Sequence, residues 1–204
     1  MSGKIYLVRH GETYWNKLGI MHGQFDIPLN DTGRLQAKNV AKELLDTKID
    51  ICYSSPLQRS LFTAKEIMKF HRGIPIITDN RLMEINKGEL EGAHRDSEEL
   101  LKDEPLDILQ QYKIESKAHF FKRVNDFYNE ILVENKNKNI LIVSHSGTTK
   151  MSLFYFNPPD NDIVDEWYNV HIKNCCVYTV DNKIPTIKPK LREYNVDKEL
   201  YPLI

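Results

Sequence analysis

Short apolar runs rich in β-branched residues recur along the chain and predict the strands of a buried sheet. The first run, Ile5–Val8, is followed at once by an arginine, a histidine and a glycine. Ile140–Val143 repeats this pattern, because His145 and a glycine follow it closely. The other expected strands are Ile49–Tyr53, Pro75–Thr78 and Cys175–Val180, with Ile187–Glu193 at an edge.

Segments with apolar residues at helical spacing lie between these strands. After the second strand, Ser55 predicts an N-cap and Pro56 the first residue of a helix. Arg59 then falls in or just after the first turn of that helix. The other expected helices are 31–46 capped by Asn30, one from Ser116 to about Asn135, and one from Gly147 through Phe154.

Alternating strands and helices of this kind predict an α/β fold. We expect three α/β/α layers, with a mostly parallel central sheet and helices on both faces. The 204 residues fit one domain over 1–204, since domains commonly contain roughly 100–200 residues. The segment at about 93–115 is charged and weakly periodic, and we interpret it as a short cap-like insertion.

The charge balance argues against nucleic acid or a membrane as a partner. The chain has 28 basic and 29 acidic residues and a net charge of -1, so it has no strong overall field. Its three cysteines suggest neither a disulfide framework nor a metal site, which is typical of a reducing compartment. No signal peptide and no apolar run of about 20 residues is evident, so we expect a cytoplasmic protein.

Chemically active side chains follow the predicted strands. Ligands of open α/β sheets bind beyond the carboxyl ends of the strands, where Arg9, His10 and His145 are expected. Arg59 lies near a helix N-terminus, which itself attracts anions. Glu84 lies in a charged loop. The set predicts a phosphate site in which guanidiniums, a protonated imidazole and an Asn side chain hold oxygens while a neutral histidine attacks.

Other phosphotransfer and hydrolase motifs are absent from the sequence. There is no GxxxxGK[ST] loop, no GxGxxG opening and no carboxylate cluster spaced for magnesium. Ser144 and Ser146 flank His145, but no GxSxG elbow surrounds them. Each histidine taken alone is more often structural than catalytic, so only the joint pattern supports a phosphate site.

The Arg-His-Gly-Glu-Thr run at 9–13 is followed by further motifs over most of the chain. Together they resemble the histidine phosphatase superfamily, the phosphoglycerate-mutase-like proteins, whose fold the resemblance also implies. The motifs are Trp15-Asn16, then Asp26, Pro28-Leu29, Gly33 and Gln36-Ala37, then Ser54–Leu57, Arg59 and Thr63-Ala64, then Leu82, Glu84, Gly88 and Glu91-Gly92, and finally Val143–His145.

This resemblance implies a role for each matching residue. His10 is the implied nucleophile that becomes phosphohistidine, and neighbouring guanidiniums should keep it neutral. Glu84 is the implied general acid, which protonates the leaving alkoxide and then helps to activate water. Neither a metal nor another cofactor is required. The remaining implied site residues are His145, as a third catalytic residue, and Arg9, Arg59 and Asn16, which hold the phosphoryl oxygens.

The sequence departs from the family pattern along the expected pocket wall. His22 precedes Gly23 where relatives often carry Gln, and Ser146 and Lys150 stand where Gly and Arg are frequent. We therefore take His22, Gly23 and Ser146 as candidate substrate contacts, although His22 also fits an ordinary loop histidine. These departures make substrate preference hard to transfer from a relative.

The resemblance favours a phosphomonoester hydrolase acting on a small phosphorylated metabolite. Mutases of the superfamily typically carry a longer insertion between the acid and the second histidine than separates Glu84 from His145 here. A cofactor-dependent phosphoglycerate mutase is the alternative, since both reactions use the same groups. A protein that binds phosphate ligands without turnover is the second alternative, and a homodimer is left open.

Overall fold

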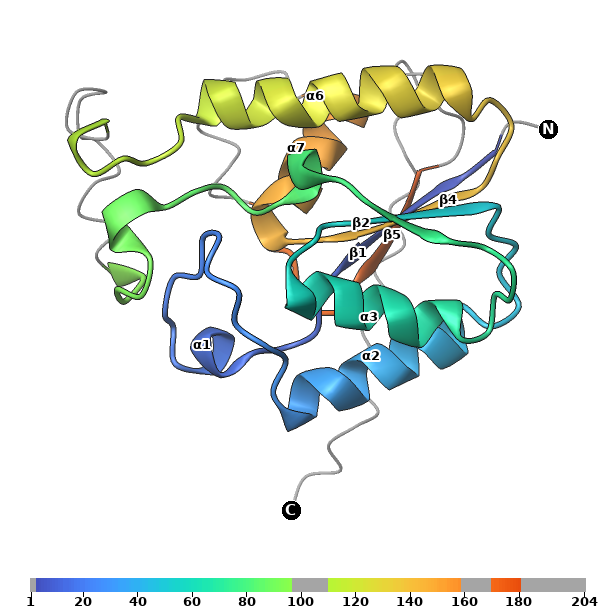
Figure 1. Cartoon of the computed structure of the whole chain (residues 1–204), viewed down its shortest axis with the longest axis horizontal. Helices are drawn as coiled ribbons and strands as arrows, with labels where there is room; N and C mark the ends of the chain where they lie inside the picture. The colour runs from blue at the N-terminus through green and yellow to red at the C-terminus, as the bar shows by residue number, and fades with distance from the viewer. Residues whose placement is uncertain (1–2, 97–109, 159–169, 181–204) are drawn as a thin grey trace.

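The sheet has five strands in the order β3-β2-β4-β1-β5, seen in a computed structural model that describes residues 3–96, 110–158 and 170–180 (Figure 1). Four strands run parallel, and β5 pairs antiparallel with β1 at one edge. The strands are β1 (Ile5–Arg9), β2 (Ile51–Ser54), β3 (Ile76–Thr78), β4 (Ile140–Ser144) and β5 (Val177–Val180).

The register of the parallel strands brings their carboxyl ends together. Arg9 at the end of β1 pairs with Ser144 at the end of β4, and Ser54 of β2 pairs with Val143. His10 and His145 are therefore the next residues after neighbouring strands. The sheet thus places both histidines at one edge before any side-chain contact is considered.

Two pairs of helices cover the two faces of the sheet (Figure 1). Helices α6 and α7 lie on one face, and α2 and α3 lie on the other, so the predicted α/β/α fold class is confirmed. Asn30 and Ser116 cap α2 and α6, as predicted. The helices are α1 (Tyr14–Lys17), α2 (Asp31–Glu43), α3 (Gln58–Met68), α6 (Lys117–Glu134) and α7 (Ser146–Phe156), with short 3-10 turns η1 (Asn80–Leu82) and η2 (Gly88–Leu90).

Alternation along the strands divides the core between the two faces. Ile140 and Ile142 of β4 pack in the cluster that α6 and α7 cover, whereas Leu141 and Val143 pack against α2 and α3. Because β4 lies at the centre of the sheet, all five of its residues are buried. The site is therefore built on two strands, β1 and β4, whose residues are almost all buried.

The start of α3 differs from the prediction. The helix begins at Gln58 rather than at Pro56, and Leu57 occupies the N-cap position without a side-chain cap. The Ser55 hydroxyl instead lies 2.8 Å from the ring of His145. Arg59 nevertheless falls in the first turn, as expected. Most of the expected cap-like insertion and the edge strand at 187–193 lie outside the described residues.

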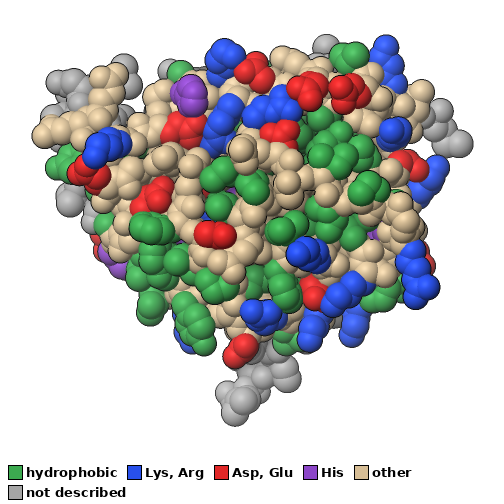
Figure 2. Space-filling view, viewed as in Figure 1, with side chains coloured by type: hydrophobic (Ala, Val, Ile, Leu, Met, Phe, Trp, Pro, Cys, Tyr) green, Lys and Arg blue, Asp and Glu red, His purple; other side chains and the backbone are tan. Residues whose placement is uncertain are grey.

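The surface carries charges of both signs. Figure 2 shows basic and acidic side chains interspersed over the face it presents, which agrees with the net charge of -1. Within the described ranges, no helix combines the length and apolar character needed to cross a membrane.

Candidate active site

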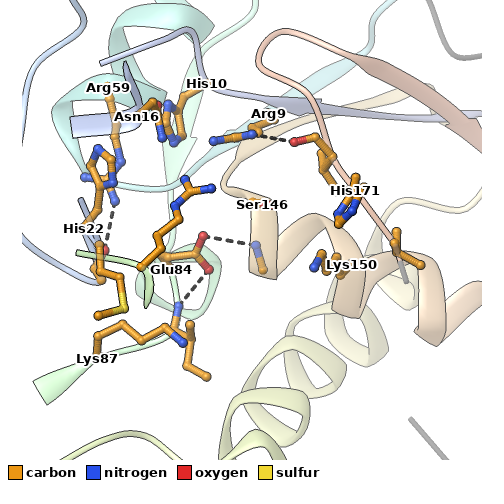
Figure 3. A pocket seen from close by; sticks show the side chains of 17 residues that line it. Arg9, His10, Asn16, His22, Arg59, Glu84, Lys87, Ser146, Lys150 and His171 are labelled. Carbon is orange, nitrogen blue, oxygen red and sulfur yellow. Dashed lines mark hydrogen bonds between the residues drawn. The ribbon is translucent and has the colours of Figure 1, made fainter. Parts of the chain in front are cut away.

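A pocket of about 390 Å³ opens at the carboxyl edge of the sheet. It gathers side chains that are far apart in the sequence but follow β1, β2 and β4 or lie in loops beside them. His145 is fully buried next to His10, with 5.2 Å between the ring centroids. Eight of the sequence-predicted site residues line the pocket, namely Arg9, His10, Asn16, His22, Gly23, Arg59, Glu84 and Ser146 (Figure 3).

The ring of His10 is held in a form suited to nucleophilic attack. Its Nδ1 lies 2.7 Å from the carbonyl oxygen of Gly11, which can only accept, so Nδ1 carries the proton. Nε2 is then left with a free lone pair. Burial, followed by the charges of Arg59 and Arg9, lowers the pKa of His10 well below its ordinary value. The expectation that guanidiniums keep this ring neutral agrees with that direction.

The glycine after His10 is needed for close packing. A Cβ on Gly11 would lie 2.4 Å from the carbonyl oxygen of Gly33 in α2, which is shorter than real Cβ contacts. Gly11 also donates its N–H to the hydroxyl of Thr63 in α3. The loop after β1 is therefore pressed against two helices, and this contact fixes the backbone that carries His10.

Arg59 is fully buried below the pocket. Its two Nη atoms donate to the carbonyl oxygens of Phe25 and Gly23, at 2.7 and 3.0 Å. Gly23 has a φ of +47°, a conformation that favours glycine. Desolvation lowers the pKa of Arg59 to about 10, so its guanidinium still carries a charge at neutral pH. Its buried Nε has no hydrogen-bond partner among the residues that the structure describes.

Arg9 extends the positive wall from the end of β1. Its Nη1 donates to the carbonyl oxygen of Ile172, and its buried Nε has no partner within the described part of the chain. Burial, followed by the charge of Arg95, lowers the pKa of Arg9 to about 10. Figure 3 shows Arg9, Asn16 and Arg59 grouped around His10. These cationic donors surround the point at which a phosphoryl group would meet Nε2.

Asn16 turns its donor side into the pocket because its oxygen is already used. The Oδ1 atom accepts from the Thr13 N–H at 3.2 Å and from Nδ2 of Asn174 at 3.3 Å. Asn174 also donates to the carbonyl oxygen of His10 at 2.9 Å. Sequence reasoning missed Asn174, whose only signal is a polar residue just before an apolar strand.

His145 shares the neutral character of His10. Its Nε2 lies 2.8 Å from the Ser55 hydroxyl and 3.4 Å from the Ser60 hydroxyl. Its buried Nδ1 has no hydrogen-bond partner among the described residues. Burial, followed by the charges of Arg59 and His10, lowers the pKa of His145 well below its ordinary value. The protein alone thus favours a neutral ring here, not the protonated imidazole expected from the sequence.

His22 is a buried member of the same wall. Its Nε2 contacts the hydroxyl of Thr13, the N-cap of α1, and its ring lies 5.5 Å from that of Trp15. Burial, followed by the charges of Arg59 and Arg9, lowers the pKa of His22 to about 3. His22 therefore both supports its loop and lines the pocket. The sequence left these open as alternatives, an ordinary loop histidine or a candidate substrate contact.

Glu84 lies across the pocket from His10 (Figure 3). One carboxylate oxygen accepts from the Ile85 N–H at 2.9 Å, and the other accepts from the Gly147 N–H at 3.1 Å. Gly147 lies in the first turn of α7, next to Ser146. The carboxyl group is thus fixed between its own loop and the helix that follows His145.

Four more cationic or basic side chains line the pocket beyond the phosphate-holding wall. The sequence indicated Lys150 only as a departure from the family pattern at the pocket wall, and it did not single out the other three as site residues. Among the described residues that line the pocket, Glu84 is the only carboxylate. The additional side chains are Lys87, Arg95, Lys150 and His171.

Within the described ranges, no group of three or more His, Cys, Asp or Glu side chains is arranged to hold a metal ion. The donors that line the pocket include guanidiniums, ammonium groups, an amide and imidazoles, which bind oxygen anions directly. The arrangement can therefore hold a phosphoryl group beside a neutral imidazole and a carboxyl group.

Comparison with known proteins gives a family match over most of the chain. The model of the histidine phosphatase superfamily (branch 1) matches residues 5–196. Phosphoserine phosphatase 1 of Hydrogenobacter thermophilus is 34% identical over 152 residues, covering 70% of this chain and 71% of that protein. A 2,3-bisphosphoglycerate-dependent phosphoglycerate mutase of Buchnera aphidicola is 32% identical over 201 residues, covering 79% and 87%.

A solved structure agrees with the sequence relatives. Phosphoserine phosphatase from Entamoeba histolytica, in complex with 3-phosphoglyceric acid, superposes with a TM-score of 0.73 at 29% identity. The match covers 87% of this chain and 89% of that one. The chain is therefore similar both to phosphatases and to a mutase.

Proposed function

The chain belongs to the histidine phosphatase superfamily, and from this premise we propose that it hydrolyses phosphomonoesters through a phosphohistidine at His10. The observation that carries the proposal is the state of the His10 ring. Its Nδ1 proton is engaged by Gly11, its Nε2 lone pair is free, and its pKa is low. An imidazole in this state is nucleophilic at neutral pH.

In the first half of the reaction, Nε2 of His10 attacks phosphorus and the bond to the leaving oxygen breaks. The charge on the transferring oxygens is held by Arg9, Arg59 and the Asn16 amide, with His145 as a further donor. Glu84 gives its proton to the leaving alkoxide, so an alcohol departs. The products of this half are a phosphohistidine and a Glu84 carboxylate.

In the second half, water attacks the phosphohistidine in line with the phosphorus–nitrogen bond. The Glu84 carboxylate takes a proton from that water, and the bonding electron pair returns to Nε2 of His10. Inorganic phosphate leaves, and both residues regain their starting states. The cycle uses no cofactor.

We propose that the substrate is a small metabolite with a second anionic group near the phosphate. Lys87, Arg95 and Lys150 line the pocket beyond the phosphoryl position, and Glu84 is the only carboxylate among its described lining residues. A carboxylate on the substrate would be favoured there by Coulomb attraction. This agrees with the phosphoserine phosphatases among the relatives.

Phosphate release from matched pairs of esters tests the proposal. We expect hydrolysis of 3-phosphoglycerate and phosphoserine, with kcat/KM about tenfold or more above glycerol 3-phosphate and phosphoethanolamine, which lack the carboxylate. Absence of phosphate release across the panel would favour the non-catalytic alternative. Equal rates within each pair would remove the second-anion requirement and leave the hydrolase proposal standing.

A mutase is the second candidate because one of the relatives is a phosphoglycerate mutase. Both reactions begin with the same phosphohistidine, and they differ in whether water or a second substrate hydroxyl receives the phosphoryl group. The interconversion of 2- and 3-phosphoglycerate should therefore be assayed beside phosphate release. We expect hydrolysis to be faster, and faster interconversion would identify a mutase.

A further inference from the structure

Glu84 lies between the short turns η1 and η2, in a segment that belongs to no strand or α-helix. Backbone carbonyl groups in such a segment are not paired by regular structure and need other donors. In this protein the donors are side chains from elsewhere in the chain. The position of the proposed acid therefore depends on side chains other than Arg9, Arg59 and Asn16, which are proposed to hold the phosphate.

Arg123 of α6 supplies three of these hydrogen bonds, and Gln24 and Thr148 supply others. Its Nη1 donates to the carbonyl oxygens of Arg81 and Met83, at 2.7 and 2.8 Å, and its Nη2 donates to that of Glu84, at 2.9 Å. One guanidinium thus binds three carbonyl groups within four residues of the chain. Its plane also lies over the ring of Phe120, with Cζ 4.4 Å from the ring centroid.

Glu115 fixes the orientation of that guanidinium. Its two carboxylate oxygens accept from Nε and Nη2 of Arg123, at 2.7 and 2.9 Å, which gives the fork geometry that arginine favours. All five N–H groups of Arg123 then have an acceptor. Glu115 also accepts from the Asn86 N–H and donates its own N–H to the Asn86 carbonyl, so it binds the far end of the same segment.

The Glu115–Arg123 pair is largely shielded from water, with side-chain exposures of 8% and 14%. Burial alone would raise the pKa of Glu115, but hydrogen bonds and charge from Arg123 outweigh it and hold the pKa below its ordinary value. A buried, charged and fully hydrogen-bonded pair is rigid, because any displacement leaves charged groups unpaired. Such a pair suits the fixing of a neighbouring backbone.

We propose that Arg123, oriented by Glu115, is a positioning residue that sets Glu84 for proton transfer. The proposal rests on the proposed function, in which Glu84 is the general acid. Arg123 and, at 3.1 Å, Gln24 donate to the Glu84 carbonyl, while the Gly147 N–H donates to its carboxylate. With the backbone released, the carboxyl group loses its fixed distance to the leaving oxygen. An error of about 1 Å in such a distance can cost on the order of 10²-fold in rate.

The test uses leaving groups of different quality with the full-length protein. Arg123→Lys keeps the charge but cannot form the fork or bind three carbonyl groups. Values of kcat/KM are compared, because they report transfer to His10 and not the attack of water on phosphohistidine, which both substrates share. We expect kcat/KM for 3-phosphoglycerate to fall by about tenfold to a hundredfold. The rate with p-nitrophenyl phosphate, whose leaving group needs no proton, should change by less than about threefold. Equal losses with both substrates would overturn the proposal.

A double-mutant cycle separates positioning from a general structural role. In a Glu84→Gln background, Arg123→Lys should cause no further loss with 3-phosphoglycerate, because the acid is already gone. Losses that multiply would overturn the proposal. If Arg123→Lys does not fold, Glu115→Gln provides the second variant, since it keeps the side-chain size but weakens the fork; it should show the same selective loss and the same lack of additivity.

Glu130→Gln is the matched control. Glu130 also projects from α6 to the Glu84-bearing segment, where it pairs with the Arg81 side chain at 2.8 Å, but it binds none of the carbonyl groups. Its rates should match those of the unmodified protein, and a selective loss equal to that of Arg123→Lys would contradict a specific role for Arg123. If Glu84→Gln slows 3-phosphoglycerate selectively and Arg123→Lys does not, the positioning role of Arg123 is rejected and the acid role of Glu84 stands. Equal slowing of both substrates by Glu84→Gln counts against the proposed acid itself.

Discussion

The phosphate-holding side of the pocket grows from the ends of β1 and β4 and from the first turn of α3, whereas the Glu84 side is an irregular segment bound by side chains. The positions of Arg9, His10 and Arg59 are fixed by strands and a helix that pack in the core. The position of Glu84 is fixed by hydrogen bonds from Arg123, Gln24 and the start of α7. A rigid sheet edge and a loop supported by hydrogen bonds thus meet across one cavity.

This difference separates two functions that a phosphoryl transfer requires. The strand-end side must hold charge, and burial of cations next to a neutral imidazole achieves this without movement. The loop side must place one proton donor, and hydrogen bonds from several elements can adjust that position. We therefore expect damage to the two sides to have different kinetic signatures.

The largest effect should come from the strand-end side. Arg59→Gln removes a buried positive charge from the transferring oxygens, so the rate should fall by about 10³-fold for 3-phosphoglycerate and p-nitrophenyl phosphate alike, since both transfer the same group. Steady-state kinetics with the two substrates measures this. A fall confined to one of them would show that Arg59 does not serve the phosphoryl group.

The loop side should give a smaller and selective effect. Glu84→Gln removes the proton donor but keeps the size of the side chain, so 3-phosphoglycerate should slow by about 10²-fold. p-Nitrophenyl phosphate should slow far less, because its phenolate leaves without protonation. The ratio of the two kcat/KM values is the measurement, because kcat/KM reports transfer to His10 and not the later attack of water, which both substrates share. An unchanged ratio would show that Glu84 has only a structural role.

A third effect concerns the acid stability of the strand-end side. The folded protein lowers the pKa of His22 from 6.5 to about 3, so between these pH values the unfolded chain binds a proton that the folded chain does not. Stability then falls as pH drops below 6.5. His22 alone should contribute a loss of about 2 kcal/mol of unfolding free energy between pH 7.5 and 5.

His22→Gln isolates this contribution, because glutamine can hydrogen-bond to Thr13 but does not titrate. Urea denaturation at pH 7.5 and pH 5 should show a loss for the variant that is about 2 kcal/mol smaller than for the unmodified protein. Equal losses in the two proteins would show that His22 is not held neutral in the folded state.

The same contrast explains what the sequence could predict. His10 and His145 each follow an apolar run that is recognisable as a buried strand from the sequence alone. The fold class and the grouping of these residues could therefore be predicted from local patterns. Arg59 was accessible because a serine and a proline mark the approach to α3, although the helix starts two residues later than predicted. The residues on this side are positioned by buried strands and helices, and burial of one face of such an element produces a periodic pattern of apolar residues in the sequence.

The remaining features depend on contacts between distant segments. Asn174 orients Asn16 across most of the length of the chain, and Arg123 binds the Glu84 carbonyl from another helix. Neither contact leaves a period or a motif in the sequence. Ser55 was assigned to a helix cap because hydroxyl residues favour that position, and its contact with His145 became visible only in three dimensions.

The central claim is that His10 carries the phosphoryl group, and trapping the intermediate tests it most directly. Rapid-quench labelling with a ³²P-labelled substrate should give a phosphoenzyme that is stable in alkali and labile in acid, with the label in the peptide that contains His10. His10→Ala should give no label, while Glu84→Gln should still be labelled by a substrate with a good leaving group. Label on another residue, or equal labelling of His10→Ala, would contradict the account.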